Sequence, residues 1–269
     1  MNLFTQPFAL LYRNRALILN LTRRELEGRY KGSVLGRVWI IVNQLALLAV
    51  YSFVFGFIFK TKIGSSSGDM SSNFALWLYC GLLPWFFINE SLTISVRDIV
   101  SKVNFVKKIA FPLEILPIVS VIIAFINMSI GVLLLLGGTI VFGMGLHLEM
   151  LSFILFVPPL FLGVSGLAMI VASMGVYFRD LAQMVGLIML LWMYATPIMY
   201  NADMVPEEFR FLFTYNPLAS IVDLMRSAFF WHSDLNFLFL GGFYIGSIVL
   251  YMIGFHVFRK LKIGFSDVL

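Results

Sequence analysis

Apolar runs recur along most of the chain and are separated by short polar breaks. An α-helix needs about 20 apolar residues to cross a bilayer. Six segments approach this length, and the fifth ends at Thr196-Pro197, where we expect the helix to unwind because proline lacks a backbone N–H. The sequence therefore predicts an all-α integral membrane protein with six transmembrane helices, at residues 38–59, 74–96, 115–142, 150–176, 184–200 and 237–258.

The composition supports this fold class. Of the 269 residues, 60% are hydrophobic and only 12% are charged, whereas a soluble domain carries about 25% charged residues. The single cysteine, Cys80, lies in an apolar run and predicts neither a disulfide framework nor a cysteine metal site. We expect one transmembrane domain over residues 1–269, made of an interfacial segment (1–37), a six-helix bundle (38–258) and a tail (259–269).

Basic residues are distributed unevenly between the two faces of this bundle. Six crossings put both termini on one side, and that side receives 15 of the 19 Lys and Arg residues, within 1–37, 97–114, 177–183 and 259–269. The positive-inside rule places this side, with both termini, in the cytoplasm. Topology thus explains the net charge of +5, and nucleic acid is not an expected partner.

The N-terminal segment has the pattern of an amphipathic helix. Apolar residues recur at spacings of three, four and seven, as in Phe8, Leu11 and Ile18. This pattern predicts a helix on the inner membrane surface, with arginines near lipid phosphates. The alternative is a solvated leader. The polar residues assigned to the interfacial segment are Arg13, Arg15, Arg23, Arg24, Arg29 and Tyr30.

Two polar connections also contain apolar residues. Segment 97–114 predicts a short amphipathic cytoplasmic helix that ends before Pro112, with an apolar face suited either to docking another protein or to lying on the membrane. Segment 201–236 is interrupted by Asn216-Pro217 and is too short and too charged to cross. We expect this outer segment to form two re-entrant helices that dip into the outer leaflet.

Few side chains have the pattern of a catalytic site. The sequence contains no H-E-x-x-H motif, no paired carboxylates at a cytoplasmic helix end and no G-x-x-x-x-G-K-[ST] phosphate loop. A membrane glycosyltransferase is therefore not favoured, no metal site is expected, and any ATP hydrolysis requires another chain. Glu90 lies in the second span, about 9 Å from its cytoplasmic end. It could couple protons, but with no basic partner in another span it fits hydrogen bonding within the bundle better.

Aromatic residues make up 16% of the chain. Their flat apolar faces suit the sliding of sugar rings, because they make contact without a fixed hydrogen-bond register. Packing between helices and interfacial belts are the alternatives. The candidates for lining a conduit through spans one, two and five are Tyr51, Phe55, Phe59, Trp85, Phe86, Trp192 and Tyr194, together with Glu90.

Several motifs recur in a fixed order relative to the six spans. They are RYKGSVLGRVW (29–39), GLLPWFF (81–87), KIAFP (108–112) with Leu116-Pro117, FRD (178–180) with Gln183, TPIMY (196–200) and Asn216-Pro217. In this order and at this spacing, they resemble the permease subunits of polysaccharide ABC exporters. This type-2 ABC export family includes O-antigen, capsule and teichoic acid transporters. The resemblance covers nearly the whole chain, although Gln44 stands where relatives often have proline.

The resemblance implies a homodimer in the bacterial inner membrane that exports a lipid-linked polysaccharide. Each copy would pair with a cytoplasmic ATPase, which binds the ATP and magnesium, so this chain would be a transport subunit and not an enzyme. ATPase coupling would fall to Asn104, Phe105, Lys107, Lys108, Phe111 and Pro112, with Arg179 and Asp180 in a second cytoplasmic turn. The outer gate would include Pro197, Tyr200, Asn216, Pro217 and Arg226.

Two alternatives remain at this point. One is the permease of an ABC exporter for a drug or another small lipophile, which would share the general architecture. The other is a proton-coupled secondary carrier, for which Glu90 would be essential.

Overall fold

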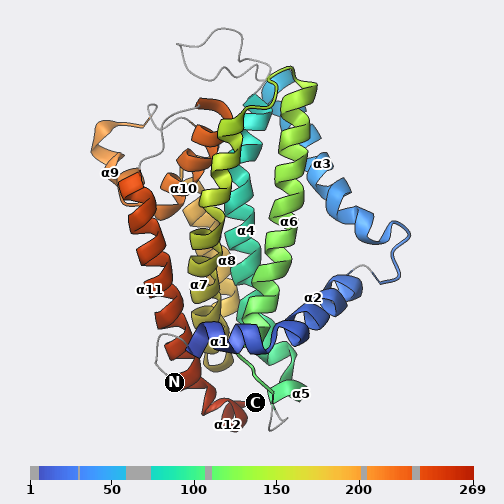
Figure 1. The fold of residues 1–269 in the computed structure, drawn as a ribbon, viewed down its shortest axis with the longest axis vertical. Helices are drawn as coiled ribbons and strands as arrows, with labels where there is room; N and C mark the ends of the chain where they lie inside the picture. The colour runs from blue at the N-terminus through green and yellow to red at the C-terminus, as the bar shows by residue number, and fades with distance from the viewer. Residues whose placement is uncertain (1–5, 30, 59–73, 107–110, 201–204, 232–236) are drawn as a thin grey trace.

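The computed structural model describes residues 6–29, 31–58, 74–106, 111–200, 205–231 and 237–269. In these residues the regular elements are helices, most of which run along one long axis (Figure 1). Tyr30, Phe59, Lys107 and Lys108, which the sequence analysis singled out, lie outside this part of the chain, as does the side chain of Phe55.

Four long helices form the centre of the bundle: α4 (Phe74–Ser101), α6 (Ile115–Val141), α7 (Val157–Tyr177) and α11 (Phe237–Lys262). Helix α4 packs on both α6 and α7, and α11 runs along α7. Because neighbours cover several of its sides, α4 is buried along most of its length. Among the described helices, three are long and apolar enough to cross a membrane, namely α6, the stretch Leu148–Tyr177 and α11.

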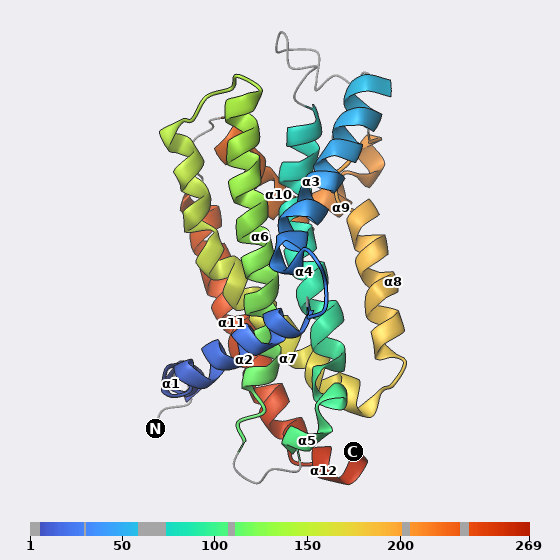
Figure 2. The ribbon, with the colours of Figure 1, turned by 90° about the vertical axis from the view of Figure 1, so that its right-hand side faces the viewer.

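Two shorter apolar helices flank this centre. Helix α3 (Trp39–Tyr51) follows a short turn, η1 (Gly36–Val38), and continues as a π-helix, η2 (Ser52–Ile58). Helix α8 (Leu181–Tyr194) stands at the side of the bundle (Figure 2). It ends before Thr196-Pro197, as expected. Each of the six expected segments contains a helix, although the fifth is helical only to Tyr194. The crossing of the membrane by α3, α4 and α8 stays a prediction.

The fourth expected span is divided. A 3₁₀-helix, η4 (Leu148–Leu155), precedes α7, and α7 begins at Val157 with two prolines in its first turn. Proline is tolerated there because the first backbone N–H groups of a helix have no partner within it. The length of the apolar run predicted one continuous helix over 150–176, because run length does not take account of this break.

The N-terminal segment is docked on the protein. It forms α1 (Gln6–Arg13) and α2 (Arg15–Arg29), which cross the lower end of the bundle in Figure 1. The expected single helix is therefore divided at Asn14. Ile18 packs with Ile115, Val119 and Ile123 of α6. This packing rules out the solvated leader, and much of the apolar face of α2 contacts helices and not lipid.

The two ends of the bundle carry short elements. Helices α5 (Val103–Val106) and α12 (Phe265–Val268) lie at the same end as α1 (Figure 1). The first residues of the expected amphipathic helix over 97–114 belong to α4, which continues to Ser101 before α5 begins. Toward the opposite end lie η6 (Glu207–Phe209), α9 (Phe211–Thr214), α10 (Pro217–Arg226) and the π-helix η7 (Ser227–Trp231). Helix α10 packs on α4, and its re-entrant position in a bilayer stays a prediction.

Candidate functional site

Asn216 joins the end of α8 to the start of α10. Its side-chain oxygen accepts hydrogen bonds from the backbone N–H of Leu218 (3.0 Å) and from the indole of Trp192 (2.8 Å). Its amide donates to the Thr196 hydroxyl (2.9 Å) and to the Ala195 carbonyl (3.2 Å). Asn216 is thus both the N-cap of α10 and a clamp on the turn that follows α8.

Arg226 holds the same turn from the other end of α10. The side chain is only 3% exposed, and its guanidinium donates to the carbonyls of Pro197 (2.8 Å) and Ile198 (2.7 Å). It also lies over the ring of Trp77, 3.4 Å from the centroid. A side chain at Gly81 would come within 2.8 Å of this guanidinium, so the glycine provides the space that it occupies.

Four of the predicted outer-gate residues therefore lie in one hydrogen-bonded unit: Pro197, Asn216, Pro217 and Arg226. Pro217 is the first residue of α10 and follows the Asn216 cap. The fifth, Tyr200, is placed beside this unit, with its hydroxyl donating to the Tyr194 carbonyl (2.8 Å). These contacts bind the end of α8 firmly to α10.

Glu90 lies in a polar cluster that the sequence analysis did not foresee. Its carboxylate forms an ion pair with Arg29 of α2 (2.7 Å), and both of its oxygens accept from the Asn127 amide of α6 (2.9 and 2.8 Å). The sequence analysis considered only basic partners in other spans, and this partner comes from the interfacial segment instead. Hydrogen bonding within the protein is confirmed.

A cavity of about 220 Å³ lies beside this cluster, between α3, α4 and α6. Glu90, Asn127 and Phe86 line it together with Gln44. The side-chain oxygen of Gln44 accepts a hydrogen bond from the Tyr79 hydroxyl (2.8 Å). Gln44 therefore links α3 to α4 at the position where relatives were expected to have proline.

The aromatic conduit candidates are spread over several surroundings. Phe86 lines the cavity beside Glu90, whereas Trp192 lines another of about 540 Å³ between α7, α10 and α11. Trp85 donates to the Met189 carbonyl of α8 (3.3 Å), and Tyr51 is half-buried against the core. Tyr194 is 61% exposed. A conduit formed by these side chains stays a prediction.

The predicted coupling loop is anchored by two aromatic rings. The centroids of Phe105 and Phe111 are 4.6 Å apart, and both rings pack against the buried cluster that contains Ile99 and Leu113. Pro112 follows them, and the side chain of Asn104 points outward and is exposed. The two phenylalanines therefore anchor the described residues on either side of 107–110 to the core, while Asn104 is exposed.

The second predicted coupling turn lies between α7 and α8. Arg179 and Asp180 are both exposed there. The Asp180 carbonyl accepts from the N–H groups of Gln183 (3.0 Å) and Met184 (3.1 Å), which starts α8. The turn thus presents one cation and one anion at the end of the bundle that carries α5 and α12.

A charged network connects α2 with α4 and α6 near the same end. Lys102 bridges Asp98 (3.0 Å) and Glu25 (3.2 Å), and Asp98 also accepts a hydrogen bond from the Ser120 hydroxyl. Burial raises the pKa of the Asp98 carboxyl, while the Lys102 charge and the hydrogen bonds from Ser120 and Lys102 oppose that shift. This network and the Arg29–Glu90 pair fix α2 to the bundle at two points.

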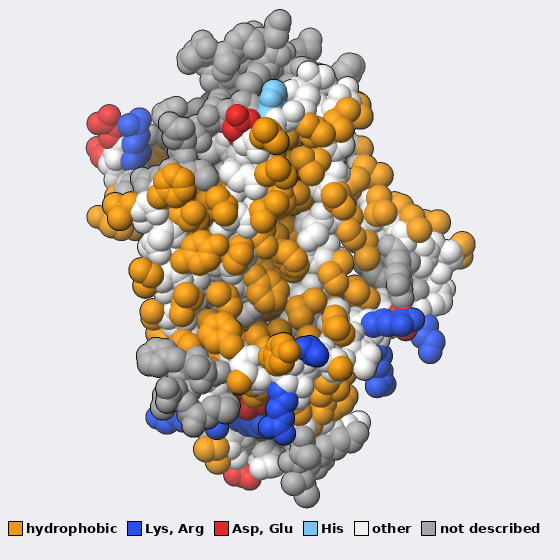
Figure 3. Space-filling model, in the orientation of Figure 1, with side chains coloured by type: hydrophobic (Ala, Val, Ile, Leu, Met, Phe, Trp, Pro, Cys, Tyr) orange, Lys and Arg blue, Asp and Glu red, His pale blue; other side chains and the backbone are white. Residues whose placement is uncertain are grey.

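The other predicted interfacial arginines are more exposed. Arg15 lies over the Tyr12 ring, 4.5 Å from its centroid, and Arg23 pairs with Glu27 (3.0 Å). Arg24 lines a cavity of about 510 Å³ between α2, α5 and α6. Basic side chains gather at this level in Figure 3, below a face covered by hydrophobic side chains. This separation fits a position at a membrane boundary.

Sequence reasoning missed Asn127 and the network around Asp98. Asn127 carries a detectable signal, because it is an amide inside the apolar run 115–142, and such a residue is costly in lipid without a partner. The pairing of Lys102 with Glu25 has no signal in the sequence, since the two residues come together only when α2 docks. Among the described residues, no group of three His, Cys, Asp or Glu side chains could hold a metal ion.

Comparisons with known proteins give a consistent result. The profile of the ABC-2 type transporter family matches residues 16–230. An O-antigen export system permease protein, RfbA, of Klebsiella pneumoniae is 31% identical over 257 residues, which cover 94% of this chain and 95% of the relative. RfbA of Myxococcus xanthus is 28% identical over 82% of this chain and 83% of its own length. The polysialic acid transport protein KpsM of Escherichia coli is 23% identical over 76% and 78%.

Proposed function

Since the chain belongs to the family of ABC-2 type transporters, we propose that it is the membrane subunit of an ATP-driven polysaccharide exporter. The observation that carries this proposal is the 31% identity to an O-antigen export permease over 94% of the chain. The substrate would be a lipid-linked polysaccharide, and a separate cytoplasmic subunit would bind and hydrolyse ATP. The chain would lie in the bacterial inner membrane with both termini in the cytoplasm.

The exporter would contain two copies of this chain. An exposed apolar face on α8 supports this part of the proposal: Leu187, Ile188 and Leu191 are 59%, 52% and 60% exposed. Met184 and Tyr194 extend the same face at helical spacing. A second copy would cover this face and place the α8 helices beside a shared conduit, with Trp85 and Phe86 of the neighbouring α4 close to it.

The arrangement of short elements supports a division of roles along the bundle. Asn104 of α5 and the Arg179-Asp180 turn are exposed at the end that carries both termini, where an ATPase would bind. The Asn216–Arg226 unit lies toward the opposite end and would form part of the outer gate. Helices α4 and α8 connect the two regions and would transmit the movement.

Deletion of the gene in its native host tests the function. We expect loss of the surface polymer and accumulation of its lipid-linked form inside the cell, with both reversed by the plasmid-borne gene. An exporter of drugs or small lipophiles would leave the surface polymer unchanged. That outcome would overturn the proposal.

Coupling is tested by reversing the charges of the second turn. We expect the double variant Arg179→Glu, Asp180→Arg to retain about a tenth or less of the ATPase that co-purifies with the native chain, because repulsion between misplaced charges costs several kcal/mol. Lys260→Glu, at an exposed position of α11 at the same end, is the control. Equal recovery of the ATPase with all three proteins would reject this binding surface. Phe105→Asp is a poorer test, since Phe105 packs inward and its loss disturbs the loop itself.

Glu90→Gln separates an exporter from a proton-coupled carrier. The amide keeps an acceptor for Asn127 but loses the ion pair with Arg29. The side chains of Arg29 and Glu90 are 26% and 25% exposed. A partly exposed pair contributes about 1 kcal/mol or less. We expect polymer export to stay within about twofold of the native rate, measured in the gene-deleted host. Complete loss of export in a folded Glu90→Gln protein would favour the carrier.

A further inference from the structure

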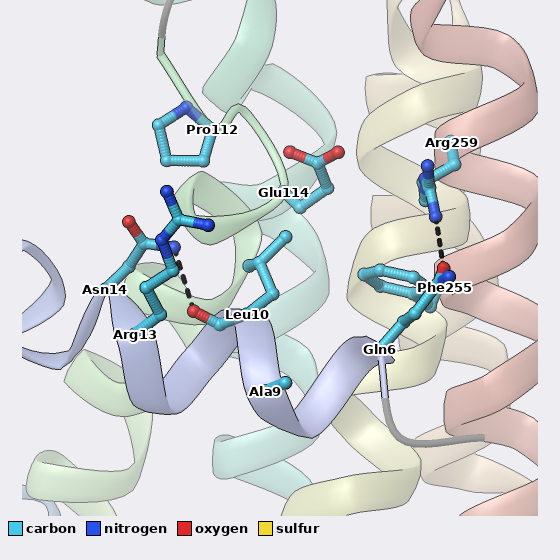
Figure 4. Close-up of a pocket in the computed structure, with 9 residues that line it drawn as sticks. All are labelled: Gln6, Ala9, Leu10, Arg13, Asn14, Pro112, Glu114, Phe255 and Arg259. Carbon is cyan, nitrogen blue, oxygen red and sulfur yellow. Dashed lines mark hydrogen bonds between the residues drawn. The ribbon is translucent and has the colours of Figure 1, made fainter. Parts of the chain in front are cut away.

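A cavity of about 670 Å³ lies where α1 crosses the start of α6 and the end of α11 (Figure 4). Arg13 and Arg259 line it from different helices, and in the view of Figure 4 Glu114 stands between them. Leu10 and Phe255 add apolar walls. The volume is in the range of about 300–1,000 Å³ that is typical of ligand sites.

The charge of this cavity is positive. Glu114 is only 5% exposed and pairs with Lys262, whose Nζ lies 3.0 Å from each carboxylate oxygen. Its negative charge is therefore compensated by its own partner. Arg259 donates to the neutral side-chain oxygen of Gln6 (2.6 Å). In the described part of the chain neither Arg13 nor Arg259 forms an ion pair with a carboxylate, so no anionic side chain there compensates their charge.

The cavity lies at the boundary between an apolar surface and a basic one. On α1, Phe8 and Tyr12 are exposed. Along α11, Ile248 lies two helical turns before Phe255, which lines the cavity, and is 39% exposed. This spacing places the two residues on one face of the helix. A ligand at Arg259 could therefore have its charged group in the cavity and its hydrocarbon on this face.

We propose that this cavity binds the phosphate of an anionic phospholipid in the leaflet that α1 contacts. Guanidinium groups bind phosphate oxygens through paired, charge-assisted hydrogen bonds, and basic pockets between helices at the cytoplasmic side bind lipid headgroups. One phosphate between Arg13 and Arg259 would join α1 to α11 and add to the Arg259–Gln6 bond that already links these helices. The lipid would thus fix the position of the interfacial segment.

The test uses the full-length chain in neutral detergent and measures bound lipid by native mass spectrometry. Phosphatidylglycerol is expected to bind, and phosphatidylcholine is expected to bind more weakly. In Arg13→Gln, Arg259→Gln we expect at least about tenfold weaker phosphatidylglycerol binding, since one lost charge-assisted hydrogen bond corresponds to about a factor of ten. Arg15→Gln is the matched control, because Arg15 is exposed on the adjacent helix and lies outside the cavity. It should bind as the native chain does.

Three outcomes would overturn the proposal. Undiminished binding by the double variant would show that the lipid binds elsewhere, and an equal loss in Arg15→Gln would show diffuse attraction without a site. A thermal shift with inorganic phosphate equal to that with phosphatidylglycerol would reject the lipid as ligand in favour of a free anion. Should the double variant fail to fold, Arg13→Gln alone keeps the test decisive, because Arg13 is exposed. Arg259→Lys, which keeps the charge, is expected to restore part of the binding.

Discussion

Arg226→Met is expected to lower both the thermal stability of the protein and its export of polymer. Methionine fills much of the same space but leaves the carbonyls of Pro197 and Ile198 without their donor. Each buried acceptor without a partner costs about 1–3 kcal/mol, and the contact with Trp77 is lost as well. Replacing a buried cation also removes its desolvation penalty, which offsets part of this cost. We therefore expect the free energy of unfolding to fall by about 3 kcal/mol.

The measurements are the apparent melting temperature in detergent and the amount of polymer at the cell surface. Arg210→Gln is the control, since Arg210 is an exposed arginine of the same outer segment, and exposed substitutions usually change stability by less than about 0.5 kcal/mol. Arg226→Lys should be intermediate, because one ammonium cannot reproduce the planar guanidinium. Native stability and native export in Arg226→Met would show that the clamp is dispensable. Native stability with no export would instead place Arg226 in transport itself.

The helices of this protein could be predicted well from the sequence, because apolar runs of membrane-spanning length leave little freedom. The third expected span, 115–142, differs from α6 (Ile115–Val141) by a single residue. The end of α8 was predicted from Thr196-Pro197, which is also a local signal, because proline lacks the backbone N–H that would continue the helix. Local rules failed where two prolines started a new helix, at the junction of η4 and α7.

The polar contacts could be predicted only in part. Asn216-Pro217 is a local signal, because asparagine is a preferred N-cap and proline a preferred first residue of a helix. The pair Arg29–Glu90 is separated by 61 residues, and it forms only because α2 returns to the bundle. The same holds for Arg226, whose two acceptors lie 28 and 29 residues earlier. The hydrogen bonds of Arg226 depend on the packing of α10 against α4, which no spacing in the sequence reveals.

The coupling loop shows a different limit of sequence reasoning. The apolar residues among the lysines of segment 97–114 predicted an amphipathic helix, but such a pattern does not say which surface the apolar residues contact. In the structure, Phe105 and Phe111 contact the protein's own core. The surface left for an ATPase is therefore the polar side of the loop, which includes Asn104. This changes which variants can test coupling without unfolding the loop.

Glycine positions in α11 give a prediction in which the same substitution has opposite effects. At Gly254 a side chain would meet the backbone of Gly166 in α7, with Gly166 Cα only 2.8 Å from the new Cβ. Backbone cannot move aside as a side chain can, so the two helices must separate. Small residues that let helix backbones approach closely are the usual means of packing in membranes. At Gly241 of the same helix, nothing lies within 4 Å.

We therefore expect Gly254→Ala to destabilise the protein by about 1–3 kcal/mol, the usual cost of overpacking, and to reduce the folded fraction recovered in detergent. Gly241→Ala should be neutral or stabilising by up to about 1 kcal/mol, because alanine has the higher helix propensity. The apparent melting temperatures of the two variants, measured side by side, check this difference. If both substitutions shifted the melting temperature equally and in the same direction, close contact between α7 and α11 would not be what holds this part of the bundle together.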